Sequence, residues 1–219
     1  SLSHQTRLPD ELVVTDDGST DETTQIVKKF AQSAPFRVTL LVNESTLGYS
    51  QNFGKAISRC SGDVVFPCDQ DDWWFERKIQ VMLEYLRDHP QTSLVLCDTL
   101  MTDAELMPSG ESKLGNIKSS GLPDTAHVMG CCIGIRRNLV KLVLPVPQEV
   151  PAHDNWMVQL ADELGVADRL DVPLQYYRIH GKNASAFFVN RSKEPSHFAT
   201  LRDRLARFMR RFKAVGGMA

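Results

Sequence analysis

The chain has 219 residues, of which 42% are hydrophobic and 24% charged, and its formal net charge is −2. This length and composition predict a soluble globular domain with a sizeable core, and the near-neutral charge gives no argument for a nucleic-acid partner. No apolar run approaches the roughly 20 residues of a membrane-spanning helix. The five cysteines lack the paired spacing of a zinc site, so we expect reduced thiols in a cytoplasmic protein.

The first predicted strand covers residues 12–15 and leads directly into a tight acidic turn. Gly18 can adopt the positive φ that such a turn requires, and a helix over 23–31 follows. Asp16 and Asp17 stand at the carboxyl end of this strand, where ligands bind in open α/β sheets. The two carboxylates are therefore candidates for ligand contact, with turn formation as the alternative.

The most informative stretch is a short apolar run over 64–68, predicted to be a buried strand, that ends in three carboxylates within four residues. Asp69, Asp71 and Asp72 repel one another, and nothing basic in the run offsets them. A divalent cation would relieve this repulsion, because Mg²⁺ and Mn²⁺ prefer hard oxygen ligands. The alternative is a solvated acidic turn in which Asp72 caps a helix that begins near residue 75.

Predicted strands and helices alternate over the first hundred residues, which is typical of a parallel sheet with helices on both faces. The alternation then stops, and residues 107–123, rich in Pro, Gly and Ser, are predicted to be a mobile loop. The remaining strands are expected at 37–42, 93–98, 128–136 and 170–177. The remaining helices are expected at 50–60, 75–87, 139–144 and 153–164.

The C-terminal segment over 200–213 is predicted to be a basic amphipathic helix, with six Arg or Lys residues, a single Asp and an apolar stripe. Such a helix can lie on an anionic membrane surface. The alternative is that it docks on its own domain and leaves its charges solvated.

Taken together, these motifs resemble the inverting family-2 glycosyltransferases of the GT-A fold, over nearly the whole chain to about residue 183. The matching motifs come in the family's order: Val13 to Asp21, Asn43 to Gly48, Asn52 to Ala56, Ser61-Gly62-Asp63, Asp69-Gln70-Asp71-Asp72, Gly130 to Arg137, and His153-Asp154. The stretches Asp69 to Trp74 and Tyr177 to Asn183 look most like the rhamnosyltransferase-like enzymes of surface polysaccharide synthesis.

The resemblance implies a GT-A fold, an α/β domain with a mostly parallel sheet flanked by helices. It implies a transferase domain over 1–190, with a nucleotide-sugar half at 1–100 and an acceptor half at 101–190, followed by the basic helix in 191–219. The implied reaction moves a sugar, with inversion, from a nucleotide-diphosphate donor to a hydroxyl of a glycan or lipid-linked acceptor, with Mn²⁺ or Mg²⁺ as cofactor. We expect this to occur in the cytoplasm, with peripheral contact to the inner face of the membrane through the basic helix as an option.

The resemblance also assigns roles to single residues. Asp69 and Asp71 match the family's DxD pair, so Asp71 is expected to bind the metal and Asp69 to contact the metal or the ribose. Asp154 falls at the position of the family's catalytic base, although it could instead cap a helix. The further expected contacts are Asp16 or Asp17 with the base or ribose, Arg178 with the diphosphate, and His180 with the metal or a phosphate.

One departure from the family concerns the start of the sequence. The family begins with a strand that lies centrally in the sheet and a turn that cradles the nucleotide, whereas this sequence starts after both. Two alternatives to a glycosyltransferase stay open. One is a degenerate module that binds nucleotide sugars without catalysis, which the missing start favours, and the other is a nucleotidyltransferase on a similar sheet. The second usually carries a Gly-rich, Arg-bearing loop, which this sequence does not show.

Overall fold

A computed structural model describes residues 1–180 and 183, and Ser1–His180 form one compact unit. The basic helix expected at 200–213, within the predicted segment 191–219, lies outside the described residues. In the part of the chain that is described, no helix is long and apolar enough to span a membrane.

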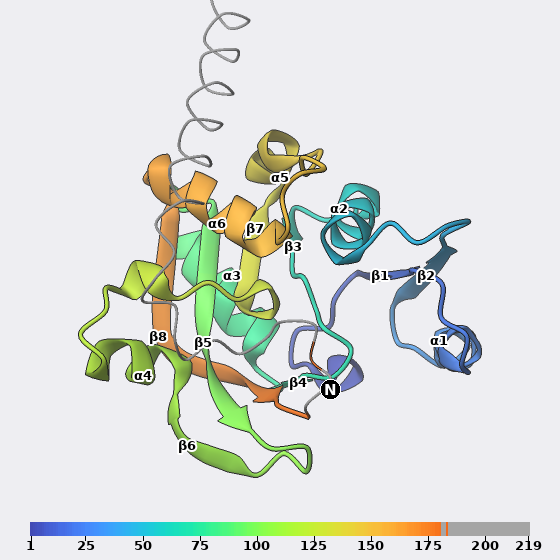
Figure 1. Ribbon diagram of the computed structural model, residues 1–219, viewed down its shortest axis with the longest axis horizontal. Coiled ribbons are helices and arrows are strands. Elements are labelled where there is room, and N and C mark those ends of the chain that lie inside the picture. The colour runs from blue at the N-terminus through green and yellow to red at the C-terminus, as the bar shows by residue number, and fades with distance from the viewer. Residues whose placement is uncertain (181–182, 184–219) are drawn as a thin grey trace, which may run out of the picture. The chain divides into compact units, whose positions relative to one another are not determined.

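The compact unit contains two separate sheets (Figure 1). The larger sheet has the strand order β3-β7-β5-β8-β4, with β6 paired to β5, and the smaller one pairs β1 with β2. The strands are β1 (Glu11–Asp16), β2 (Arg37–Val42), β3 (Val64–Val65), β4 (Trp73–Trp74), β5 (Leu94–Thr102), β6 (Pro108–Ser112), β7 (Ile133–Arg136) and β8 (Ala167–Arg178).

The α/β class is confirmed, but the expectation of a mostly parallel sheet is wrong. Among the described strands only β1–β2 and β5–β8 pair in parallel, and the other four pairs are antiparallel. Strand-like sequence does not encode direction, which depends on the connection. Only five residues separate β5 from β6, fewer than the dozen or so that a parallel crossover needs.

Helices cover the larger sheet and bury its central strand. Eight of the nine residues of β5 are buried, and the core cluster includes Met82 and Leu86 from one face of α3 together with Val95 and Leu174 from the sheet. The spacing of four residues between Met82 and Leu86 places both on one helical face. The helices are α1 (Thr23–Ala31), α2 (Tyr49–Arg59), α3 (Lys78–Asp88), α4 (Lys113–Ser119), α5 (Arg137–Val143) and α6 (His153–Glu163).

Three segments differ from the sequence-based expectation. Residues 107–123, predicted to be a loop, contain β6 and α4, whose N-cap Ser112 accepts a hydrogen bond from the Gly115 N–H. The strand expected at 128–136 is divided into a 3₁₀ turn (Gly130–Cys132) and β7. The helix expected from residue 75 begins at Lys78, because residues 73–74 pair with β8 as strand β4.

Polar contacts of Glu11 join the small sheet to residues 61–62 and tie its two strands together. Among the described residues, no apolar side chain before Ile57 is buried. Instead, the Glu11 carboxylate accepts hydrogen bonds from the backbone N–H groups of Ser61 (2.5 Å) and Gly62 (3.2 Å) and forms an ion pair with Arg37 (2.5 Å). Although burial opposes it, these contacts lower the pKa of Glu11 to about 2.

We expect the Glu11→Gln variant to lose about 1.5–3 kcal/mol of unfolding free energy at pH 7, since hydrogen bonds to charged groups contribute in this range. A carboxyl whose pKa is depressed in the folded state stabilises the fold above its unfolded pKa. That stability is lost as the pH falls from about 4.5 toward about 2. Urea unfolding at pH 7 and pH 3 should therefore show that the difference in unfolding free energy between variant and wild type is smaller at pH 3. A difference that is equal at both pH values contradicts the assignment, and the exposed Glu22→Gln variant is the control.

Candidate active site

The acidic segment over 69–72 lies between β3 and β4, beside the carboxyl end of β8. Strand β4 pairs antiparallel with β8, with Trp73 opposite Tyr176 and Trp74 opposite Gln175. This pairing brings the acidic segment to the last residues of β8 although more than 100 positions separate them in the sequence. The short ladder of β4 is therefore what positions the carboxylates.

The carboxylate of Asp69 is the centre of this cluster. Burial, together with the nearby charges of Asp72, Asp71 and Asp154, raises its pKa to about 7, and Lys78 partly offsets them. Within the described residues, no hydrogen bond to the Asp69 carboxylate is found, so its oxygens are available to a ligand. An anion that is crowded by three others and lacks a donor is suited to bind a cation.

Asp72 is held on both of its oxygens by β8. The side-chain amide of Gln175 donates to Oδ2 and the backbone N–H of Arg178 donates to Oδ1, each at 3.3 Å. Burial is the largest cause that raises the pKa of Asp72. The alternative role expected for Asp72, capping the next helix, is wrong, because the N-cap of α3 is Arg77 and β4 lies between them.

Asp71 lies beside His180, whose ring nitrogen Nε2 is 2.8 Å from Asp71 Oδ2. The sequence-based hypothesis made both residues metal ligands together with Asp69. The structure places the three in one neighbourhood, and their roles as ligands stay a prediction. Arg178, expected to contact a diphosphate, is half-buried at the end of β8, with its backbone N–H on Asp72.

Asp154 joins the cluster from the other half of the chain. It lies in the first turn of α6, whose N-cap is Ala152. The alternative role expected for Asp154, as the N-cap of this helix, is therefore wrong. Its Oδ2 accepts a hydrogen bond from the Gly130 N–H at 3.1 Å. A Cβ at residue 130 would lie 3.3 Å from His153 Nε2 and 3.4 Å from the Asp154 Cβ, so the absent side chain permits this close approach.

An aromatic group adjoins Asp154. The ring of His153 stacks on Phe53 with centroids 4.2 Å apart and meets the ring of Tyr49 edge-on at 5.0 Å. Burial lowers the pKa of His153 to about 4, so the imidazole is neutral near pH 7. Burial, followed by the charges of Asp154 and Asp69, raises the pKa of Tyr49.

Asp16 and Asp17 lie at the end of β1, in the smaller sheet. Asp16 Oδ1 accepts hydrogen bonds from the N–H groups of Gly18 and Ser19, which is turn chemistry. Asp17 Oδ1 accepts from the Asn43 side chain and the Leu47 N–H, and its Oδ2 from the Gly48 N–H, at 2.7–2.8 Å. These carboxylates organise the loops at this strand end, and their contact with a nucleotide stays a prediction.

The donor set suits a hard divalent cation, with one unexpected member. Ligand atoms of Asp69, Asp72 and Cys131 lie within 4.8 Å of one another. Carboxylate oxygens are the ligands that Mg²⁺ and Mn²⁺ prefer, and Asp69, whose carboxylate has no hydrogen-bond donor in the part of the chain that the structure describes, can bind one. The residues present therefore fit such an ion.

Three residues next to the carboxylates were missed by the sequence reasoning: Lys78, Cys131 and Gln175. Lys78 precedes Met82 and Leu86 at intervals of four and so shares the apolar face of α3, a periodicity that could have identified it as buried. Gln175 is one of five polar or charged residues in β8, and nothing in the local pattern marked it as the buried one among them. Cys131 carried no such signal, because its neighbours predicted only a buried strand.

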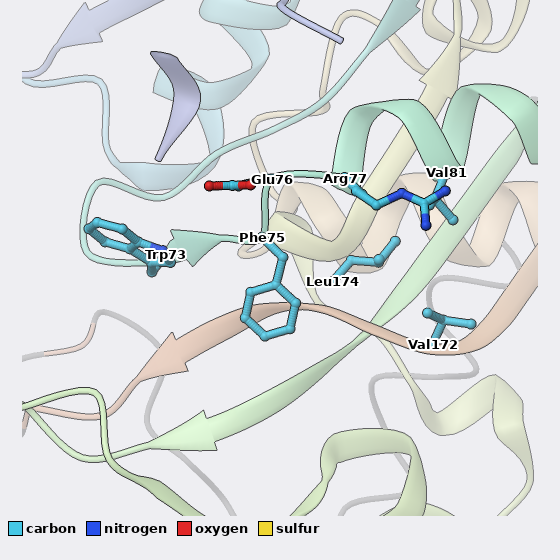
Figure 2. A pocket seen from close by; sticks show the side chains of 7 residues that line it. All are labelled: Trp73, Phe75, Glu76, Arg77, Val81, Val172 and Leu174. Atoms are coloured by element: carbon cyan, nitrogen blue, oxygen red, sulfur yellow. The ribbon is translucent and has the colours of Figure 1, made fainter. Parts of the chain in front are cut away.

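A separate hollow of about 480 Å³ lies over β4 and β8 (Figure 2). Trp73, Phe75 and Leu174 line it, with Glu76 and Arg77 at the same cavity. Neighbouring side chains on a strand point to opposite faces, so this hollow opens on the face of β4 away from buried Trp74. None of the site residues predicted from the sequence lines it.

Comparisons with known proteins find glycosyltransferases among the relatives of this chain. The chain is 26% identical to an uncharacterized glycosyltransferase of Nostoc over 84% of the chain and 60% of that protein, and 30% identical to the amylovoran biosynthesis glycosyltransferase AmsE of Erwinia amylovora over 43% and 35%. The chain thus spans no more than 60% of the length of these relatives.

Solved structures share the fold. S. aureus TarS in complex with UDP-GlcNAc matches with a TM-score of 0.65 and 18% identity, over 94% of this chain and 60% of that one. A mannosyltransferase of Pyrobaculum calidifontis in complex with GDP-Man and Mn²⁺ matches with a TM-score of 0.56 and 19% identity, over 80% and 50%. The family model for glycosyl transferase family 2 matches residues 1–144. With this match over more than half of its length, and with its GT-A fold, the chain belongs to glycosyl transferase family 2.

Proposed function

We propose that this chain carries the donor and catalytic site of an inverting, metal-dependent glycosyltransferase of surface polysaccharide or glycan synthesis. It would transfer a sugar from a nucleotide-diphosphate donor to a hydroxyl of a glycan or lipid-linked acceptor. The observation that carries the proposal is the convergence of Asp69, Asp71, Asp72 and Asp154 from two distant parts of the chain. A fold without chemistry has no need to hold four carboxylates together against their repulsion.

The reaction must stabilise the departing diphosphate and remove a proton from the acceptor hydroxyl, and we assign these two tasks to different carboxylates of the cluster. Asp69 and Asp71, with His180 beside them, would hold Mn²⁺ or Mg²⁺. When bound, the ion would stabilise the negative charge of the departing nucleoside diphosphate. Asp154 would accept the proton of the acceptor hydroxyl as that oxygen forms its bond to the anomeric carbon. Its hydrogen bond from Gly130 holds the carboxylate in place for that step.

The structural neighbours support a nucleotide-sugar donor. TarS is described in complex with UDP and with UDP-GlcNAc, and the Pyrobaculum enzyme with GDP-Man and Mn²⁺. For this chain we propose the same class of donor, bound with its diphosphate toward Asp69 and Arg178 and its nucleoside toward Asp16 or Asp17. The stretches around Asp71 and His180 look most like those of rhamnosyltransferase-like enzymes, and we place this chain in that subset as part of the proposal. We further propose that the reaction occurs in the cytoplasm.

Calorimetric titration with UDP, dTDP and GDP, each with Mn²⁺ and with EDTA, tests the proposal. We expect one nucleotide to bind with Mn²⁺ and to lose its affinity with EDTA, because the carboxylates repel a diphosphate unless a cation lies between them. Radiolabel transfer from the matching nucleotide sugar then identifies the donor. A folded sample that binds none of the three nucleotides contradicts the proposal.

A further inference from the structure

The ammonium group of Lys78 is buried behind the carboxylate cluster. Lys78 is the first residue of α3 and its side chain is fully buried. Its Nζ donates to the Cys131 carbonyl at 2.5 Å and to Gln175 Oε1, and lies 3.8 Å from the centre of the Trp74 ring. Buried ammonium groups are rare unless paired, and a cation at a helix N-terminus is disfavoured by the helix dipole. The burial of this group and its place at the start of a helix both cost free energy, so favourable contacts nearby must offset them.

Gln175 connects this ammonium to the carboxylates. Its side chain is fully buried, and its Nε2 donates to Asp72 Oδ2 at 3.3 Å and to Cys131 Sγ at 3.0 Å. An ammonium has only donors, so the amide must turn its oxygen toward Lys78 and its NH₂ group toward Asp72 and Cys131. The orientation of the amide is therefore fixed by Lys78 rather than by its own packing.

We propose that Lys78 and Gln175 are positioning residues of the sugar-transfer site, which set the orientation of Asp72 and Cys131 before any ion or donor binds. The proposal rests on the glycosyltransferase function proposed above. Gln175 holds one oxygen of Asp72 and the Arg178 N–H holds the other, so this carboxylate cannot rotate freely toward or away from Asp69. Lys78 also lies close enough to Asp69 and Asp72 to act electrostatically on both carboxylates, where it partly offsets the causes that raise their pKa values. Asp72 and Cys131 have ligand atoms within 4.8 Å of those of Asp69, so the groups that orient them stand behind the candidate metal site. Removing groups in such a place commonly lowers metal affinity 10- to 100-fold.

A double variant separates positioning from packing. Lys78→Met with Gln175→Met removes both partners of the Lys78–Gln175 hydrogen bond at once and keeps side chains of similar length. The Cys131 carbonyl and Asp72 Oδ2 each lose one donor, so we expect a folded variant whose melting temperature is lower than that of the wild type. We also expect Mn²⁺ affinity, measured by electron paramagnetic resonance with the ion alone, to fall by about 10-fold or more, with a matching fall in kcat.

Gln175→Glu is the matched single variant. The new carboxylate still accepts a hydrogen bond from Lys78 and can form an ion pair with it. It cannot donate to Asp72, and it places a second carboxylate beside that residue. The same change in Mn²⁺ affinity is expected, and if the double variant does not fold this variant decides the question. Exposed Lys141→Met is the control and should leave Mn²⁺ affinity and kcat unchanged.

The outcomes separate the two proposals. If the wild type binds Mn²⁺ and nucleotide but folded variants bind both equally well, the roles of Lys78 and Gln175 are structural and this inference is overturned. If the wild type binds neither Mn²⁺ nor nucleotide, the proposed function itself fails, and the inference falls with it.

Discussion

Asp154→Asn should leave metal-dependent nucleotide binding intact and reduce kcat by about 10²- to 10⁴-fold, the usual contribution of a general base. The amide oxygen can still accept the hydrogen bond from the Gly130 N–H, so the start of α6 should keep its geometry. What the variant loses is the ability to take a proton from the acceptor hydroxyl. Nucleotide affinity by calorimetry and sugar transfer by radiolabel assay measure the two effects separately.

The control for Asp154→Asn is Asp124→Asn, which removes an exposed carboxylate outside the cluster. It should change neither nucleotide affinity nor kcat. If Asp154→Asn transfers sugar at the wild-type rate, another group accepts the proton and the role of Asp154 is wrong. If its nucleotide affinity also collapses, Asp154 belongs to the donor site rather than to the acceptor side.

The helices and the strands of the first hundred residues were largely predictable because they depend on local pattern. The helix at 23–31 and the strand at 37–42 lie where expected, since apolar spacing and turn residues define them. What could not be predicted is pairing. The direction of β6 and the insertion of β4 beside β8 depend on connection length and on contacts between distant residues, which no window of the sequence contains.

The candidate site shows the same division. The carboxylates at 69, 71 and 72 were found because several acids at the end of an apolar run are unusual without a ligand, and Asp154 was found through the resemblance to the family. Their supports were not found, because the amide of Gln175 and the ammonium of Lys78 become meaningful only when the fold brings them within hydrogen-bond distance. Similarly, the internal hydrogen bonds of Asp17 could not be inferred, since they depend on the conformation of the loop at residues 43–48.

Asp69→Asn should stabilise the protein at pH 8 while abolishing its metal-dependent nucleotide binding. Burial and the surrounding acids raise the pKa of Asp69 from 3.8 to about 7 in the folded state. Between these values the folded chain holds a proton that the unfolded chain has released, so stability falls as the pH rises through this window. An asparagine carries no charge and escapes this cost. At about 1.4 kcal/mol for each unit of pKa shift, the gain at pH 8 is at most about 4 kcal/mol.

Urea unfolding of Asp69→Asn and wild type in EDTA, at pH 4 and pH 8, measures this gain. The two proteins should be nearly equal at pH 4, where the wild-type carboxyl is protonated in the folded state, and should differ most at pH 8. Added Mn²⁺ should raise the melting temperature of the wild type and not that of the variant, because an ion that binds only the folded state stabilises it. A stability difference that does not depend on pH would mean that Asp69 is not the crowded carboxylate of the cluster. A variant that still binds nucleotide only with Mn²⁺ would instead assign the ion to Asp71 and His180 without Asp69.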